Sequence, residues 1–421
     1  MKRIIVFLLI FCLATTVFCF FALKKENEKP NGILPAPENE TSGEKLGKNE
    51  ETDNKEDELH GIWLSCYEIK KLSDGTEKEY TEKAEKLLAD LKECKINTVF
   101  FQVRAFSDAL YFSDIFPSSE YAAKKDGDEC EFDVLKLFIE CAKKYGIKVH
   151  AWVNPFRVSY NGDINSISKS NPAYKMYIQN KNTDDLIFCD KGIYYNPASL
   201  NAQRLIIDGI KEIIDNYNVY GVQFDDYFYP DCDFSADKKE YDEYSKKGGL
   251  LSLGEWRREQ LSSFISSVYS AVKEKSESLV FGISPSAKIK YNYENLYADV
   301  EKWCCCDGYI DYIMPQVYYG FKNETMPFVK VCESWEKLPR AEGVRLYCGL
   351  ALYKCGKADE NAGSGKNEWL ENNSTLVKQC KYLAENPVFT GFSLFSCSQL
   401  LDENATDISN TEIKKLAFVL K

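Results

Sequence analysis

Two adjacent carboxylates, Asp225 and Asp226, follow an apolar run in the stretch GVQFDDYFYP at residues 221–230. Successive side chains of a strand point to opposite faces, so Val222 and Phe224 share one face and Asp225 lies on the other. A carboxylate beside a buried strand is costly to desolvate unless it is paired or used in chemistry. Asp225 is therefore a candidate for acid–base or nucleophilic chemistry, and its alternative role is a structural hydrogen-bond acceptor or helix cap.

Polar side chains also follow the neighbouring apolar runs of the chain. In sequence order they are Gln102, Arg104, Asn154, Arg157, Ser284, Lys288, Gln316, Tyr318 and Tyr319. Each of these residues alone is weak evidence for a binding site. If the runs are parallel strands of one barrel, their carboxyl ends meet on one rim, and the polar residues form a ring that includes Asp225. Such a ring predicts a pocket for a polar substrate.

The apolar runs that must position these residues occur eight times. They predict strands over residues 61–65, 97–103, 148–154, 221–225, 280–284, 309–315, 345–352 and 391–396. Amphipathic patterns predict helices over residues 81–94, 132–146, 201–218, 255–275, 295–308, 328–338, 374–386 and 411–421. This alternation predicts a (β/α)8 TIM barrel. A doubly wound sheet uses the same alternation, but the count of eight and the helix after the last strand favour the barrel.

The lengths of the connections indicate which end of the barrel carries the function. Long segments follow the second, third and fourth strands, at residues 104–131, 155–199 and 226–252. The segments that lead into the strands are short. Sites of such barrels lie on the carboxyl-terminal face, so we expect the site on this elaborated rim, with Gln223 and Asp225 pointing to the barrel axis.

Composition narrows the classes of function. The net charge of −12 argues against nucleic acid as a partner, because the chain would repel phosphate backbones. Only two histidines, His60 and His150, are available for a histidine metal site or a Ser-His-Asp triad. The sixteen cysteines include no C-x-x-C pair. Most of the fourteen beyond the N-terminal apolar run sit singly in apolar segments, so we expect buried, reduced thiols.

The N-terminal segment predicts how the protein is located. Residues 1–23 carry two basic residues and then an apolar run of about 20 residues, which is long enough to cross a bilayer as a helix. No small-residue cleavage site follows, so we expect an uncleaved membrane anchor, with a cleaved signal peptide and a secreted protein as the alternative. Residues 24–58 are rich in polar and charged residues and predict a disordered linker. The barrel would then comprise residues 59–421 and lie at the cell surface.

Four blocks of the chain resemble the signature blocks of a known family. They read RAFSDALYFSDIFP, HAWVNPFR, GVQFDDYFYP and DYIMPQVYYGF, and they occur in the same order. In these blocks the chain is similar to the family-10-like glycosyl hydrolases, bacterial cell-surface proteins of which some resemble enzymes that cut peptidoglycan glycan strands stripped of their peptides. The resemblance extends from His60 to about Ser398. It implies a TIM barrel that hydrolyses O-glycosidic bonds of a cell-envelope or extracellular glycan.

The pattern around Asp225 is also similar to that of the α-amylase-like barrels, in which the matching aspartate is the nucleophile. Those enzymes take their acid from a glutamate at the end of the fifth strand, whereas the fifth strand here ends in GISPSAK without a carboxylate. Glycoside hydrolysis generally uses two carboxyl groups, so the acid must come from another position. Asp226 and Asp108 are equal candidates, and Glu68 ranks below them. Retention and inversion both remain open.

We also expect binding roles for the other polar residues of the rim. Those expected to frame the sugar are Tyr227, Tyr229 and Tyr318. Those expected to bind its hydroxyl or acyl groups are Gln102, Arg104, Asn154, Lys288 and Gln316. We expect neither a cofactor nor a bound metal ion.

Two other classes of protein remain open. A non-catalytic barrel that binds carbohydrate at the cell surface would keep the tyrosines and lack the acid, and the missing carboxylate of the fifth strand favours it. A metal-dependent hydrolase or deacetylase would hold a hard cation with Asp226, Asp231 and Asp233, although histidines are lacking nearby. Activity on defined glycans, with and without a chelator, separates these classes.

Overall fold

The computed structural model describes residues 58–420 except 123, 126, 180–183, 233 and 402–404. The predicted anchor at residues 1–23, and the predicted linker up to residue 57, lie outside the described residues. In the ranges that are described, no helix combines the length and the apolar character that a membrane span requires.

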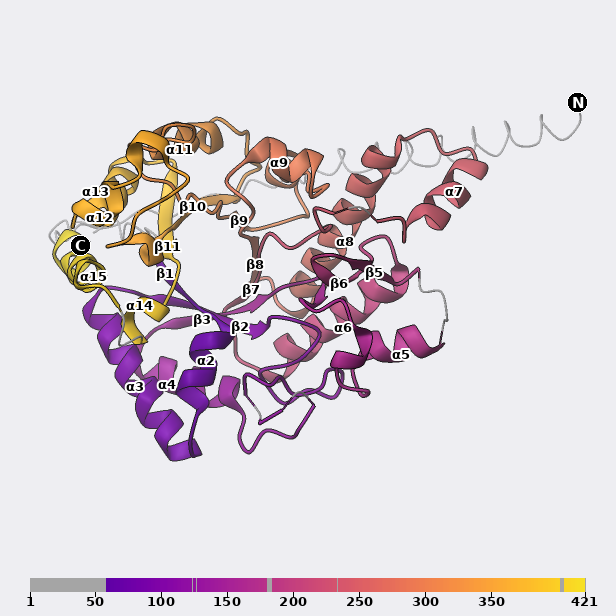
Figure 1. Cartoon of the computed structure of the whole chain (residues 1–421), viewed down its shortest axis with the longest axis horizontal. Coiled ribbons are helices and arrows are strands. Elements are labelled where there is room, and N and C mark those ends of the chain that lie inside the picture. Colours follow the sequence, from indigo (N-terminus) through magenta and orange to yellow (C-terminus); the bar gives the residue numbers. More distant parts are fainter. Residues whose placement is uncertain are drawn as a thin grey trace, which may run out of the picture. The chain divides into compact units, whose positions relative to one another are not determined.

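Eight parallel strands close into a barrel (Figure 1). They are β1 (Leu59–Leu64), β2 (Thr98–Arg104), β3 (Lys148–Val153), β7 (Gly221–Phe224), β8 (Val280–Ile283), β9 (Tyr312–Ile313), β10 (Arg345–Leu350) and β11 (Phe389–Leu394). Around the barrel the strands follow the order of the chain, and β11 pairs with β1. The predicted (β/α)8 barrel is therefore confirmed, because a doubly wound sheet would leave two open edges.

Helices surround the strands on the outside of the barrel (Figure 1). The eight that correspond to the predicted ones are α3 (Glu77–Glu93), α4 (Val134–Tyr145), α6 (Leu200–Asn216), α8 (Leu253–Lys275), α10 (Val300–Cys305), α11 (Phe328–Glu336), α13 (Thr375–Glu385) and α15 (Asp407–Val419). α10 is shorter than the predicted span of 295–308, because Asp299 caps its first turn.

Local sequence signals explain where several helices begin and end. α3 begins earlier than predicted because Thr76 and Glu79 form a capping box, in which each side chain accepts a hydrogen bond from the other residue's backbone N–H. α4 ends at Gly146, whose φ of 65° lies in the left-handed region that favours glycine. Ser199 is the N-cap of α6, and its side chain accepts a hydrogen bond from the backbone N–H of Ala202.

β7 shows the alternation that directs side chains toward the site. Val222 and Phe224 are fully buried, and the ring of Phe224 stacks on Phe264 of α8 at a centroid distance of 6.0 Å. Gln223 points the other way and accepts a hydrogen bond from Nε1 of Trp63 at 2.7 Å. The outward face of the strand therefore packs on a helix, and the inward face continues to Asp225.

Large side chains fill the inside of the barrel. They are Leu59, Trp63, Phe100, Trp152, Tyr312, Met314 and Tyr347, and they form a cluster separate from the larger core between strands and helices. Gly282 of β8 leaves the space for one of them, because a Cβ atom there would lie 2.1 Å from the ring of Tyr312. We call this cluster the barrel plug.

The rim carries elements that the sequence patterns did not predict. The segment after β3 contains β4 (Arg157–Ser159), β5 (Leu186–Cys189) and β6 (Gly192–Tyr195), which form an antiparallel sheet in the order β4-β6-β5. Shorter helices add to the connections: α2 (Cys66–Ser73), α5 (Pro172–Gln179), α7 (Lys238–Lys246), α9 (Ile289–Glu294), α12 (Glu368–Glu371) and α14 (Ser398–Leu401). Three 3-10 turns occupy Ile164–Ser166, Leu352–Lys354 and Gly363–Gly365. The connections after β3 and β7 thus contain helices or strands of their own.

Candidate active site

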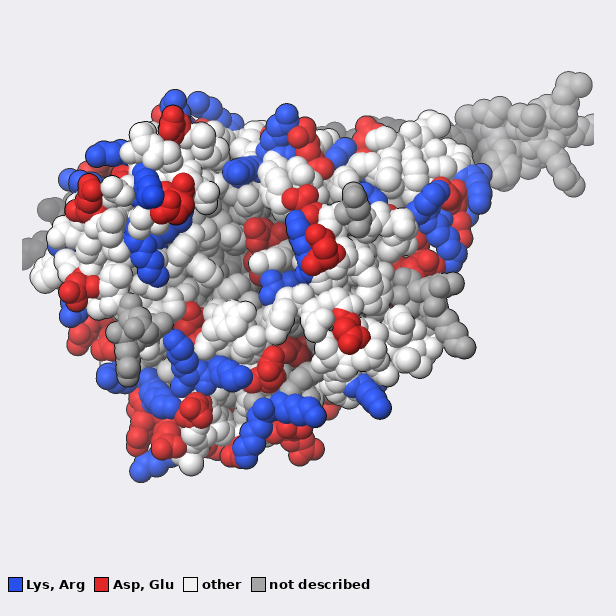
Figure 2. All heavy atoms as spheres, viewed as in Figure 1, with Lys and Arg blue, Asp and Glu red and all other residues white. Residues whose placement is uncertain are grey.

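A cavity of about 420 Å³ lies at the carboxyl-terminal ends of the barrel strands. Figure 2 shows this face of the molecule hollowed over the barrel, with acidic side chains inside the hollow. One side of the cavity, the charged wall, comprises Gln102, Asn154, Arg157, Asp225 and Asp226, which follow or end β2, β3 and β7. Another side, the aromatic wall, comprises Trp63, Tyr318 and Phe395 from the ends of β1, β9 and β11.

Asp225 is the deeper carboxylate of the charged wall, with 5% of its surface exposed. Nε1 of Trp152 donates a hydrogen bond to its Oδ2 at 2.9 Å, and the backbone N–H of Tyr227 donates to its Oδ1 at 3.3 Å. Burial, together with the charge of Asp226, raises the pKa of Asp225 to about 7. The two donors and Arg157 oppose that rise without cancelling it. Asp225 therefore takes up a proton close to neutral pH.

Asp226 lines the same cavity and is half-buried. Burial raises the pKa of its carboxyl group, while a hydrogen bond from the Gln316 side chain and the charge of Arg157 lower it. Although Asp226 comes directly after an inward-facing residue, both carboxylates reach one cavity, because the chain leaves strand geometry after Phe224. Two coupled carboxyl groups with raised pKa values suit proton transfer.

Arg157 is the cation of the cavity. Its guanidinium group lies over the ring of Tyr227 at 4.6 Å and over the ring of Phe106 at 4.5 Å. The backbone N–H of Arg157 donates to Oδ1 of Asn154 at 3.2 Å, which fixes the turn between β3 and β4. Two aromatic rings and this turn therefore hold a positive charge beside the two carboxylates.

The aromatic wall is built from rings that contact one another. Phe395 stacks on Tyr318 at a centroid distance of 5.8 Å and meets Trp63 edge-on at 6.1 Å. Trp63 and Trp152 belong to both the barrel plug and the cavity lining. We did not predict Trp63, Trp152 and Phe395 as site residues from the sequence. Strand parity could have found Trp152, since it lies two residues after the inward-facing His150 on β3.

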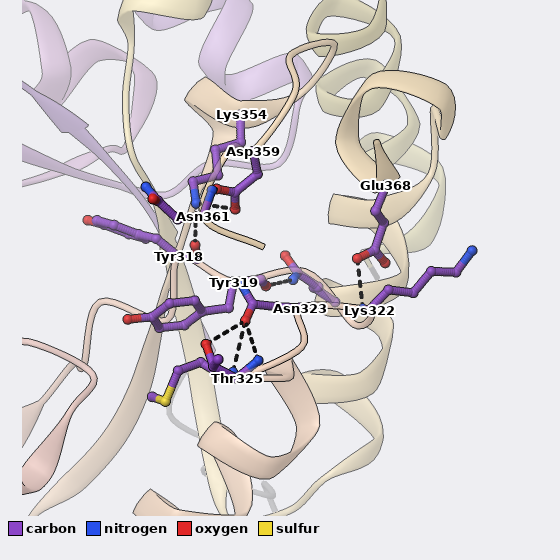
Figure 3. Close-up of polar contacts among 11 residues, drawn as sticks. Tyr318, Tyr319, Lys322, Asn323, Thr325, Lys354, Asp359, Asn361 and Glu368 are labelled. Carbon is purple, nitrogen blue, oxygen red and sulfur yellow. Dashed lines mark hydrogen bonds and ion pairs between the residues drawn. The ribbon is translucent and has the colours of Figure 1, made fainter. Parts of the chain in front are cut away.

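The loop that carries Tyr318 is fastened from behind (Figure 3). Nζ of Lys354 donates to the carbonyl oxygen of Tyr318 at 2.8 Å and forms an ion pair with Asp359 at 2.6 Å. Nε2 of Gln379 donates to the next carbonyl, that of Tyr319, at 2.8 Å. These contacts tie the segment after β9 to the segments after β10 and to α13, so the aromatic wall has a defined position.

Seven of the predicted site residues line the cavity together. They are Gln102, Asn154, Asp225, Asp226, Tyr227, Gln316 and Tyr318. Gln102 also supports the rim, because its Oε1 accepts a hydrogen bond from the backbone N–H of Cys66 at 2.8 Å. The structure thus gathers residues that are far apart in the sequence.

Three predicted binding residues lie away from the cavity. Arg104 is 1% exposed and stacks on Phe116 at 4.5 Å, because the register of β2 shifts between Gln102 and Arg104 and the side chain leaves the inward face. Tyr229 is also 1% exposed and stacks on Phe234, since the chain beyond Asp226 no longer alternates like a strand. Lys288 is exposed at the N-cap of α9.

Two predicted acid candidates also occupy other places. Asp108 is buried and lines a separate, smaller cavity beside the first. Glu68 is 4% exposed and forms the capping box of α2: the backbone N–H of Ser65 donates to it at 2.6 Å, and Oγ of Ser396 donates at 2.9 Å. Of the carboxylates proposed as the acid, Asp226 is the one that shares the cavity with Asp225.

Potential metal ligands gather outside the cavity. In the described ranges, the group of three ligand side chains close enough to hold a metal ion is Cys189, Asp190 and Cys232, whose ligand atoms lie within 4.8 Å of one another. None of the three lines the cavity. Asp231 pairs with Lys191 at 3.8 Å, and Asp233 lies outside the described residues.

Neither His150 nor Cys66 is suited to proton transfer at physiological pH. His150 is buried inside the barrel, and burial lowers its pKa to about 3, so it is neutral at physiological pH. Cys66 lines the cavity, but burial raises the pKa of its thiol, which keeps it protonated. All fourteen cysteines of the described chain are free, and nine of them are buried. The exposed ones are Cys305 and Cys306.

Comparison with known proteins relates this geometry to one family. Residues 58–366 match the family model described as glycosyl hydrolase-like 10. Glycosyl hydrolase DigH of Escherichia coli (strain K12) is 31% identical over 332 residues, which cover 73% of this chain and 73% of DigH. Glycosyl hydrolase YngK of Bacillus subtilis (strain 168) is 30% identical over 323 residues, which cover 72% of this chain and 61% of YngK. The chain thus spans less than two thirds of YngK.

Solved structures share the fold. The glycoside hydrolase domain of PgaB (BpsB) from Bordetella bronchiseptica has a TM-score of 0.57 at 13% identity, over 87% of this chain and 99% of that domain. Alpha-L-fucosidase isoenzyme 2 from Paenibacillus thiaminolyticus has a TM-score of 0.53 at 12% identity, over 86% of this chain and 49% of the fucosidase. At these identities the likeness concerns the barrel fold alone.

Proposed function

Because this chain belongs to the glycosyl hydrolase-like 10 family, we propose that it is a glycosidase that hydrolyses O-glycosidic bonds with Asp225 and Asp226. The observation that carries the proposal is the pair itself: both carboxyl groups line one cavity, and both have raised pKa values. Glycoside hydrolysis generally needs one carboxyl group that gives a proton to the leaving oxygen and one carboxylate at the sugar carbon. A coupled pair meets this need when one member is protonated and the other is charged.

The surroundings of the two groups support a division of roles. Asp225 is the more buried, and its pKa of about 7 favours the proton donor, which would pass its proton to the glycosidic oxygen as the bond to the sugar carbon breaks. Asp226 would then be the charged partner that attacks the sugar carbon or activates a water molecule. This reverses the roles expected from the sequence, in which Asp225 acts at the sugar carbon and Asp226 or Asp108 gives the proton.

The walls of the cavity support a glycan as substrate. The rings of Trp63, Tyr227 and Tyr318 offer flat surfaces for sugar faces, and Arg157 can bind an acyl oxygen or a carboxylate. We propose a cell-envelope or extracellular glycan, with peptidoglycan glycan strands as the first substrate to test. The proposed location is the outer cell surface, with residues 1–23 as the anchor. Intact protein in the culture fluid that begins near residue 20 would contradict the anchor and support secretion.

A direct assay tests the activity. The purified protein is incubated with sacculi, with glycan strands freed of peptides and with neutral polysaccharides, and the products are identified by mass spectrometry. We expect cleavage of at least one glycan, its loss in Asp225→Asn, and no effect of a chelator. Asp231→Asn is the matched control, because Asp231 is an acidic residue outside the cavity lining. Glycan binding without any product would support the non-catalytic carbohydrate-binding barrel instead.

A further inference from the structure

A second cavity of about 140 Å³ lies beside the candidate active site. One side is formed by the loop after β2, with Phe106, Asp108, Glu120 and Tyr121. The other side comes from the segment after β3 and includes Tyr160. The two long connections of the rim therefore meet around a hollow that the proposed chemistry does not use.

Aromatic side chains join the second cavity to the first. Tyr67, which lines the first, meets Tyr121, which lines the second, edge-on at a centroid distance of 5.3 Å. The guanidinium group of Arg157 lies in the first cavity and rests on Phe106 of the second at 4.5 Å. The two hollows are thus separated by single layers of side chains.

Exposed aromatic rings lie along the line that joins the two cavities. Tyr67 is 58% exposed, and Tyr160 is 66% exposed with its ring against Phe106 at 5.8 Å. Large side chains with this much exposure are offered to a partner when they gather along one groove. A ring with one free face next to polar groups suits a sugar, whose faces are apolar and whose edges carry hydroxyl groups.

The charges of the second cavity define which sugar it fits. Asp108 and Glu120 contribute two carboxylates, which are the charged groups among its described lining residues, whereas Arg157 and Lys70 lie behind the rings of Phe106 and Tyr121. Asn161 adds an amide that can both donate and accept hydrogen bonds. Carboxylates accept hydrogen bonds from hydroxyl, amide or ammonium groups and repel another carboxylate. The cavity therefore suits a neutral or amine-bearing sugar.

We propose that the second cavity is a sugar-binding subsite that takes a hexose or hexosamine unit without a carboxylate, next to the unit held in the first cavity. The inference rests on the proposed function and adds to it that the substrate is an oligomer that extends across the rim. Tyr160 forms the surface on which the sugar stacks, and the carboxylates of Asp108 and Glu120 accept hydrogen bonds from the sugar's hydroxyl or amino groups. Asp108 thus becomes a binding residue.

Calorimetric titration of the full chain tests this subsite without relying on turnover. The protein carries Asp225→Asn, and the probes are the disaccharide and tetrasaccharide of N-acetylglucosamine, the tetrasaccharide of glucosamine and a tetragalacturonate. We expect the first two tetrasaccharides to bind more tightly than the disaccharide, and Tyr160→Ala to weaken their binding about five- to tenfold. Asp108→Asn with Glu120→Gln should strengthen binding of tetragalacturonate.

Matched controls keep the outcomes distinct. Tyr220→Ala changes another exposed tyrosine, which is 41% exposed and lies at the opposite end of β7, and should leave all four affinities unchanged. The subsite would be overturned if the disaccharide and the tetrasaccharides bound equally tightly, or if Tyr160→Ala left the affinities unchanged. Either outcome would leave the proposed hydrolysis intact. Absence of binding to every probe would overturn the subsite as well. If the wild-type protein also cleaves no glycan, the proposed function falls with it.

Discussion

The charged wall and the aromatic wall of the cavity are built in different ways. The charged wall holds two carboxyl groups and one guanidinium group, and the charge of Arg157 lowers the pKa of both carboxyl groups. The aromatic wall consists of rings that contact each other and are fastened from behind by Lys354. In the proposed function, the chemistry lies on the charged wall, and the aromatic wall serves substrate binding alone. Changes in the charged wall should therefore act on turnover, and changes in the aromatic wall on substrate affinity.

The largest expected effect comes from exchanging the carboxylates. Asp225→Asn and Asp226→Asn should each lower kcat by about 10²–10⁴-fold on a natural glycan, because each removes one of the two required groups. A nitrophenyl glycoside, whose leaving group needs no proton, should restore activity to Asp225→Asn alone. Recovery of Asp226→Asn instead would return the roles to those expected from the sequence.

The charged wall should also weaken the fold at high pH. An aspartate in the unfolded chain has a pKa of about 3.9, whereas that of Asp225 is about 7 in the folded protein. Between these values the folded state binds more protons than the unfolded state, so wild-type stability falls as pH rises. Asp225→Asn should therefore exceed the wild type by roughly 1–3 kcal/mol at pH 8 and match it near pH 4. Urea unfolding at both pH values measures this, with Asp231→Asn as the control.

Arg157 should have a smaller but distinct effect. Its charge lowers the pKa values of Asp225 and Asp226, so Arg157→Gln should shift the acidic limb of the pH–rate profile to higher pH. We expect kcat/KM to fall about tenfold, as for loss of one charge-assisted contact. Arg157→Lys keeps the charge and should keep the position of that limb. If the acidic limb of Arg157→Gln stays at the wild-type pH, Arg157 does not influence the pKa values of the acid–base pair.

The aromatic wall should respond through KM. Phe395→Leu removes the ring that stacks on Tyr318, and we expect KM to rise about fivefold while kcat changes little, because the apolar volume is mostly kept. Steady-state kinetics on the cleaved glycan gives both constants. A fall in kcat at constant KM would show that the aromatic wall contributes to turnover and not only to substrate affinity.

The smallest expected effect concerns the fastening behind the aromatic wall. Lys354→Met removes the donor to the carbonyl of Tyr318 and leaves the 5%-exposed carboxylate of Asp359 without its cation. We expect KM to rise about twofold and stability to fall by roughly 1–3 kcal/mol. Adding Asp359→Asn should recover most of the stability and none of the affinity. Thermal unfolding of the single and double variants tests both statements.

The barrel and its inward-facing strand residues could be predicted from the sequence because both follow periodic rules. Asp225 and Gln102 lie where alternation along their strands puts them, and the eight strands appear at the predicted places. The rules fail where periodicity ends. Arg104 follows a register shift in β2, and Tyr229 follows the point at which the chain leaves β7.

Tertiary packing decided the features that the sequence patterns missed. The strands of the β4-β6-β5 sheet hold only three or four residues each, too few for a clear pattern. Phe395 reads as an ordinary apolar residue of the last strand, and only barrel closure brings it to Tyr318. The neighbourhood of Asp226 and Arg157 depended likewise on how two loops fold over one rim.

The barrel plug makes the site a blind pocket. Trp63 and Trp152 close its floor, and the rings of Phe100, Tyr312 and Tyr347 fill the space beneath them, so the cavity has no exit through the barrel. A polymer therefore cannot thread through the molecule as through a ring. A polymeric substrate of the proposed kind would lie across the rim, and both products of its hydrolysis would leave the cavity on the side from which the substrate entered.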